Sequence, residues 1–267
     1  MSLFNFNHEE ILSFFAVLVR FSVLITVLPF VGDKFIPSIA KILFALAISV
    51  VLYPALVTRS FIRPGEALVW GMSVSGIVGT IVLEALFGLV LGYTARLTFD
   101  SINFGSNLAG NFMGFATASS YDPHQESQTQ VIAELQMALA MLIFLVLDGH
   151  HIMLRATLNS YQIVGLGKAG FTELFNQKLI QLTGQVIRFG IQIAAPMAVS
   201  LFSVNIIFGI LAKSMPQLNV LVLSFAMSSI VGFMVMLIGV PEFQSVTRNI
   251  LERMDDWLLV MMQAMAH

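Results

Sequence analysis

No cysteine occurs among the 267 residues, which excludes disulfide bonds, thiolate catalysis and cysteine-ligated metal sites. Charged residues are also scarce: they form 10% of the chain, whereas a soluble domain carries about 25%. The 13 Lys and Arg residues nearly balance the 15 Asp and Glu residues, so no strongly basic surface is available for nucleic acid. The composition therefore excludes a disulfide-stabilised domain and argues against a nucleic-acid-binding protein.

Patterns typical of enzymes are missing as well. The sequence has no His-rich zinc spacing, no nucleophile elbow and no phosphate-binding glycine loop followed by Lys-Ser or Lys-Thr. His150 and His151 follow Asp148 and Gly149, but adjacent residues of a helix point in different directions, so a capping or interfacial role is favoured over metal binding. We therefore expect a protein without catalytic activity, cofactor or metal.

Apolar residues dominate what is present. They make up 57% of the chain, more than a soluble core of this length can cover with the few polar residues available. A membrane-spanning helix needs about 20 mostly apolar residues. The sequence therefore predicts an all-α membrane protein with about six hydrophobic helical segments, at residues 11–31, 39–57, 67–99, 131–147, 189–211 and 218–240.

The orientation of these segments follows from the basic residues. If the six segments alternate across the membrane, eight of the 13 Lys and Arg residues lie on the side of both termini and four on the other, which predicts cytoplasmic termini. The first ten residues contain Glu9 and Glu10 and no basic residue, unlike a secretory signal, so we expect the first segment to be retained.

Two further stretches have the spacing of amphipathic helices. Residues 172–187 alternate apolar and polar side chains with helical period, and the C-terminal stretch repeats the pattern. Such helices lie at a membrane surface or dock on a partner. The C-terminal apolar positions are Leu251, Met254, Leu258, Met261, Met262 and Met265.

Two charges fall deep inside apolar segments, far from either end. Arg20 lies in the first and Glu84 in the third, and a charge at membrane depth is costly enough to suggest a function. The alternative, which we favour, is a structural role in which the two pair with each other or with a neighbour. Gly88 and Gly92 are spaced for close helix packing, again a structural role.

The last two apolar segments are polar where they meet. Pro196 is expected to kink the fifth segment, and Asn205 adds an amide to it. Pro216, Gln217 and Asn219 form a polar entrance to the sixth segment. We expect Asn205 and Asn219 to hydrogen-bond across the hairpin between the two segments.

The stretch from Gly105 to Pro123 is rich in small residues and reads GSNLAGNFMGFATASSYDP. Gly110 and Gly114 are four residues apart, a spacing that permits close helix contact. A loop of small residues with bulky apolar tips could plug a channel. An ordinary helix contact that ends in a turn at Asp122-Pro123 explains the composition equally well, so the residues alone leave both interpretations open.

Several stretches resemble one protein family. They read LPFVGDKFIPSIAKILFALAISVVLYP, EALFGLVLGYTARLTFDSINFGSNLAG, NFMGFATASSYDP, LDGHHIMLRATLNSY and NIIFGILAKSMPQLNVLVLSFAMS. The resemblance is to the FliR family of flagellar type III export-gate proteins, which corresponds to the T component of virulence secretion systems. It covers nearly the whole chain, and PQLN and the G-x-x-x-G to DP stretch are its most specific parts.

The resemblance implies a core subunit of the export apparatus in the bacterial inner membrane, at the flagellar basal body. Its partners would be FliP and FliQ, with which it would form a helical hetero-oligomer around a conduit for unfolded export substrates, together with FlhB and membrane lipid. Long bent helical hairpins packed on other subunits would replace simple spans. The chain would form a single export-gate domain, with a first helical half of about 1–123 and a second of about 124–267.

The resemblance also implies a plugging loop in the conduit, and it shifts the balance toward the gate interpretation. Arg96 and Glu84, on the helix that leads into the loop, would be structural supports. The loop would consist of Gly110, Asn111, Phe112, Met113, Gly114, Phe115 and Ala116, with Phe112, Met113 and Phe115 as bulky tips.

Three alternatives remain at this point. A virulence-type secretion gate subunit is the nearest. A secondary transporter for a small solute would need polar groups at the membrane midplane and internal repeats. The sequence has few such polar groups and shows no convincing repeat. An intramembrane enzyme would need paired catalytic groups, and Arg20 and Glu84 are the only candidates.

Overall fold

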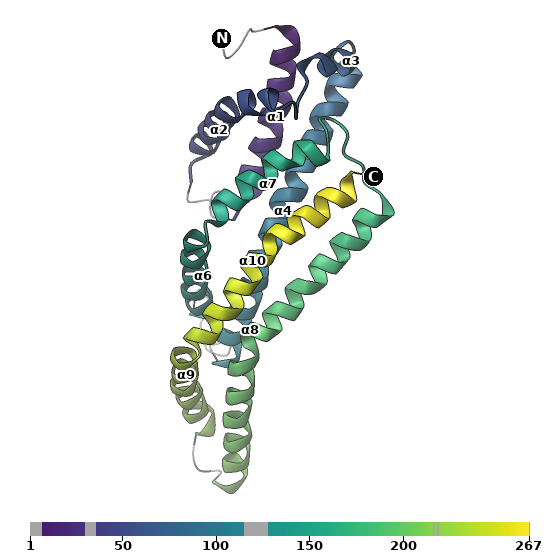
Figure 1. Ribbon diagram of the computed structural model, residues 1–267. Coiled ribbons are helices and arrows are strands. Elements are labelled where there is room, and N and C mark those ends of the chain that lie inside the picture. The colour runs from purple at the N-terminus through teal and green to yellow at the C-terminus, as the bar shows by residue number, and fades with distance from the viewer. Residues whose placement is uncertain (1–6, 30–35, 115–127, 216, 218, 267) are drawn as a thin grey trace. The chain divides into compact units, whose positions relative to one another are not determined.

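The structure is a computed structural model that describes residues 7–29, 36–114, 128–215, 217 and 219–266. Every regular element in these ranges is helical, as the sequence predicts (Figure 1). The helices are α1 (His8–Val27), α2 (Ser38–Thr58), η1 (Pro64–Glu66), α3 (Ala67–Gly71), α4 (Val74–Phe112), α6 (Gln128–Val146), α7 (Gly149–Ile163), α8 (Glu173–Ser214), α9 (Val220–Ile238) and α10 (Val240–Met265).

The described helices have the length and composition of membrane-spanning segments. Four of them, α1, α2, α4 and α8, are each long and apolar enough to cross a membrane. Two bent pairs, α6 with α7 and α9 with α10, bring the number to six if each pair counts as one span. The chain is thus an all-α membrane protein, and the expected number of hydrophobic segments is confirmed.

Helix boundaries differ from the expected ones in three places. The helix expected to end near residue 99 continues to Phe112, so residues 110–112 of the predicted loop are helical. The third apolar segment divides into α3 and α4, because the Ser73 hydroxyl accepts a hydrogen bond from the Gly76 N–H (3.1 Å) and so caps a new helix. Residues 172–187 do not form a separate amphipathic helix. No strong helix breaker separates them from the apolar run that follows, and α8 continues through both, with Pro196 inside it.

The helices form two compact units that are interleaved in the sequence. Each unit takes segments from early and late parts of the chain. The first unit contains Met1–Leu97, His150–Leu182 and Arg253–His267, and the second contains Thr98–Gly149 and Thr183–Glu252.

In the first unit, α1 packs on α2 and is crossed closely by α4. A buried cluster that includes Phe21, Tyr53 and Tyr161 forms the core beside α1. A Cβ built on Gly88 of α4 would lie only 2.5 Å from the carbonyl oxygen of Arg20, so the crossing has no room for a side chain there. A Cβ built on Gly92 would lie 2.8 Å from Val27 Cβ, which also leaves no room for a side chain. The close packing expected from this glycine pair is therefore confirmed.

The C-terminal part of α10 belongs to the first unit and packs on protein. Its apolar positions Met254, Leu258, Met261, Met262 and Met265 are buried, whereas Leu259 and Val260 are exposed, and the Gly170 N–H donates a hydrogen bond to the Met265 carbonyl (2.9 Å). The predicted amphipathic face is therefore covered by the chain itself.

Candidate functional site

The two charges expected inside apolar segments form an ion pair in the first unit. Arg20 on α1 and Glu84 on α4 are 0% and 1% exposed. The Arg20 Nε donates to Glu84 Oε2 (2.6 Å), and one terminal nitrogen donates to Oε1 (2.9 Å). This two-point contact is the geometry in which a guanidinium binds a carboxylate most strongly. The pairing expected from the sequence is present.

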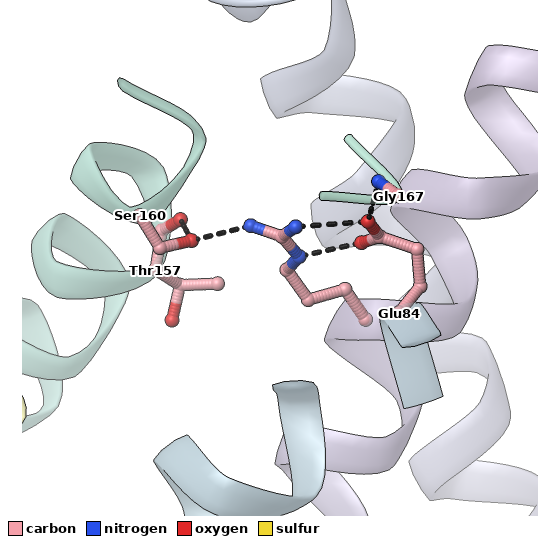
Figure 2. Close-up of polar contacts among 5 residues, drawn as sticks. Glu84, Thr157, Ser160 and Gly167 are labelled. Atoms are coloured by element: carbon pink, nitrogen blue, oxygen red, sulfur yellow. Dashed lines mark hydrogen bonds and ion pairs between the residues drawn. The ribbon is translucent and has the colours of Figure 1, made fainter. Parts of the chain in front are cut away.

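Two other segments complete the cluster. The second terminal nitrogen of Arg20 donates to the Ser160 hydroxyl on α7 (2.8 Å), which itself donates to the Thr157 carbonyl (2.6 Å). The Gly167 N–H donates to Glu84 Oε1 (2.7 Å) (Figure 2). Gly167 has φ +70°, a conformation that glycine adopts without strain. The pair thus fastens the α7–α8 connection to α1 and α4.

Aromatic rings lie against the guanidinium. Its carbon lies 4.2 Å from the centre of the Phe87 ring and 3.9 Å from that of Tyr161. Such contacts stabilise a desolvated cation by about 2 kcal/mol. A charge that is fully buried, paired and stacked is suited to hold helices together. It does not suit a group that binds or releases a substrate.

The end of α4 carries the described part of the predicted plug, residues 110–114. The helix ends at Phe112, and the N–H groups of Met113 and Gly114 donate back to the carbonyls of Ala109 and Asn111. Gly114 has φ +87°, a left-handed conformation common just after a helix. Phe115 and Ala116 lie outside the described residues.

The bulky residues of this segment differ in burial. Phe112 is 39% exposed, whereas Met113 is 0% exposed and packs in the core of the second unit with Ala109, Met197 and Leu201. In this structure Met113 is thus a packing residue. The sealing role of the segment stays a prediction, with Phe112 as its exposed apolar side chain.

The polar residues near the last two apolar segments are not bonded to each other. The Asn219 side chain accepts a hydrogen bond from the Val222 N–H (3.4 Å) as the N-cap of α9, while Asn205 is exposed on α8. The expected Asn205–Asn219 bond is absent from the described hydrogen bonds, and the Asn219 oxygen caps its own helix instead. Gln217 is exposed, and Pro216 lies outside the described residues.

The remaining candidates are at the surface. Arg96 is exposed on α4. His150 and His151, also exposed, begin α7 with ring centres 4.2 Å apart. The expectation that the two side chains point in different directions is therefore wrong, and ligand atoms of both lie within 4.8 Å of one another and of Asp148. The interfacial role stays a prediction. Sequence reasoning did not find Ser160 and Gly167, whose only signal was a serine near the end of one helix and a glycine in a short connection.

Comparison with known proteins agrees with the resemblance noted above. Residues 11–254 match the family described as bacterial export proteins, family 1. The chain belongs to this family. The matched range begins in α1 and ends in α10, so it includes Arg20, Glu84 and the end of α4.

Curated members of the export family that are similar to this chain carry the name flagellar biosynthetic protein FliR. The protein from Bacillus subtilis is 25% identical, over 89% of this chain and 90% of its own length. That from Pectobacterium carotovorum is 26% identical, over 92% and 90%. The Escherichia coli protein is 23% identical, over 85% and 84%.

Proposed function

We propose that this chain is a core subunit of the flagellar type III protein export gate in the bacterial inner membrane, at the base of the flagellum. The observation that carries the proposal is the family match over residues 11–254, together with relatives named for flagellar biosynthesis. Four to six apolar helical segments are consistent with a membrane location. The chain takes part in moving unfolded flagellar proteins and has no catalytic step of its own.

The exposed surface of the second unit supports assembly with FliP and FliQ, together with FlhB and lipid. On α8, Val199, Phe202, Ile206 and Ile210 are all exposed. They recur at helical spacing, and large exposed apolar faces are covered by protein or lipid in a functional assembly. Leu237 at the end of α9 adds to the apolar surface.

The gate function is assigned to residues 110–116. Phe112 offers an exposed ring at the end of α4, and Gly114 beside it permits a turn that other residues adopt at a cost. An apolar constriction blocks ions by expelling water. It can also move aside for a polypeptide, because no strong polar bond has to break.

A solute transporter is less well supported. Its coupling site would need available polar groups at membrane depth. Glu84, the carboxylate considered for that role, accepts hydrogen bonds from Arg20 and Gly167 and is buried. A virulence-type secretion gate remains the nearest alternative function, but the relatives that match are named for flagella.

The test is co-expression of this chain with FliP and FliQ from the same bacterium, purification in mild detergent and imaging of the product. We expect a closed helical assembly that contains all three chains. The chain alone, recovered without the others under conditions in which FliP and FliQ assemble, would contradict the proposal. A solute-binding screen would then test the transporter alternative.

A further inference from the structure

Helix α9 lies against the end of α4 at the start of the predicted gate segment, within the second unit. Phe225 and Gly232 of α9 are seven residues apart and so share a face of the helix. A Cβ built on Gly232 would lie 2.6 Å from Met113 Cγ, and one built on Gly114 would lie 3.2 Å from Phe225 Cδ2. The Met113 side chain therefore occupies the space that the missing side chain of Gly232 leaves.

Other helices of the second unit also contribute to the buried site in which the Met113 side chain lies, called its seat below. Met113 belongs to a buried cluster with Ala109 of α4, Ile132 of α6, and Met197 and Leu201 of α8, and Val231, Val235 and Met236 of α9 pack against this cluster. Met113 is fully buried here, whereas its neighbour Phe112 is partly exposed. In the sequence, the buried Met113 lies between the partly exposed Phe112 and Gly114.

We propose that Met113, seated against Gly232, is a latch through which α9 sets the position of residues 110–114. The inference rests on the proposed gate function and goes beyond it, because it names the element that controls the segment. A flexible, polarizable methionine side chain adapts to a changing partner surface, so it can leave and re-enter such a seat. A shift of α9 is transmitted to Phe112 through this contact.

Ordinary core packing would also bury Met113, so the test has to separate a latch from a space-filler. Gly232→Ala places a methyl group 2.6 Å from Met113 Cγ, so the Met113 side chain, the end of α4 or α9 has to shift. Gly209→Ala on α8 is the matched control, because a Cβ there meets no atom within 4 Å. Both changes add one methyl to a helical glycine of the same unit.

The chain has no cysteine, so Phe112→Cys introduces a single thiol as a reporter. The reporter is placed in the full-length chain, membranes are treated with a membrane-impermeant maleimide, and the labelling rate is measured on the purified tagged chain. We expect Gly232→Ala to change the rate several-fold and Gly209→Ala to leave it unchanged. Adding Met113→Ala to Gly232→Ala removes the clashing Cγ and restores the rate.

Equal labelling rates in the Gly232→Ala and Gly209→Ala chains would overturn the latch. If Gly232→Ala prevents accumulation of the protein, Met113→Leu is used instead, because it changes the shape of the side chain at similar volume. A Met113→Leu rate equal to the parent's would likewise overturn it. If the labelling rate of the thiol introduced by Phe112→Cys changes in the Gly232→Ala chain but ion leakage of the membranes does not, the latch is supported and the gate function is contradicted. Failure of the latch and failure of the gate function are therefore distinguishable.

Discussion

Removal of the Arg20 guanidinium should destabilise the first unit strongly. In Arg20→Met the apolar side chain stays between the rings of Phe87 and Tyr161, but among the described residues Glu84 keeps only the Gly167 N–H as a hydrogen-bond partner. Leaving one charge of a buried pair uncompensated costs about 3–5 kcal/mol. We expect a loss of this size in the free energy of unfolding.

The double variant Arg20→Met/Glu84→Gln separates lost charge from lost packing. The glutamine oxygen still accepts from Gly167, and no buried charge remains, so most of the lost stability should return. Arg248→Met is the matched control, because Arg248 and Glu252 form an ion pair of similar length (2.8 Å) with side chains 63% and 54% exposed. An exposed pair contributes about 0–1 kcal/mol.

The assay is thermal unfolding of the full chain in one detergent, followed by the fluorescence of its two tryptophans. We expect the unfolding temperature to be highest for the parent, followed by Arg248→Met and the double variant, and lowest for Arg20→Met. If Arg20→Met unfolds at the same temperature as Arg248→Met, the buried pair does not hold α1 and α4 together as described.

Two further predictions concern helix contacts. Gly88→Ala should lower the unfolding midpoint, because its Cβ would lie 2.5 Å from the Arg20 carbonyl oxygen, whereas Gly79→Ala on the same helix meets no atom within 4 Å and should not; equal midpoints would contradict the close crossing. Asn219→Leu removes the N-cap of α9 at a cost of about 0.5–2 kcal/mol and should reduce the yield of assembled complex. Asn219→Asp keeps the cap and should restore the yield, and a normal yield from the leucine variant would remove any role for the cap.

Features that depend on composition and local pattern were predictable from the sequence. The apolar segments could be found because lipid demands about 20 apolar residues in a row. The Arg20–Glu84 pair could be expected because a buried charge needs an opposite one and the apolar segments offer few. The close crossing at Gly88 follows from the same kind of local argument, since small residues spaced by four let helices approach.

Contacts between distant segments were not predictable in this way. Ser160 and Gly167 reach the ion pair from segments far from it in the sequence, and no periodicity marks them. An amphipathic face fits lipid, a partner or the chain itself equally well, so only the structure shows that Met254, Leu258, Met261, Met262 and Met265 are buried by the chain itself. The burial of Met113 has the same origin, because Gly232 lies more than a hundred residues away in the chain.

A measurement of ion leakage shows whether this chain contributes a gate to an export conduit. Residues 110–116 are deleted in the full chain, assembly with FliP and FliQ is verified by co-purification, and the conductance of membranes that contain the complex is compared with that of the parent complex. We expect an assembled complex whose membranes leak small ions. Membranes that stay tight around a fully assembled deletion complex would contradict it.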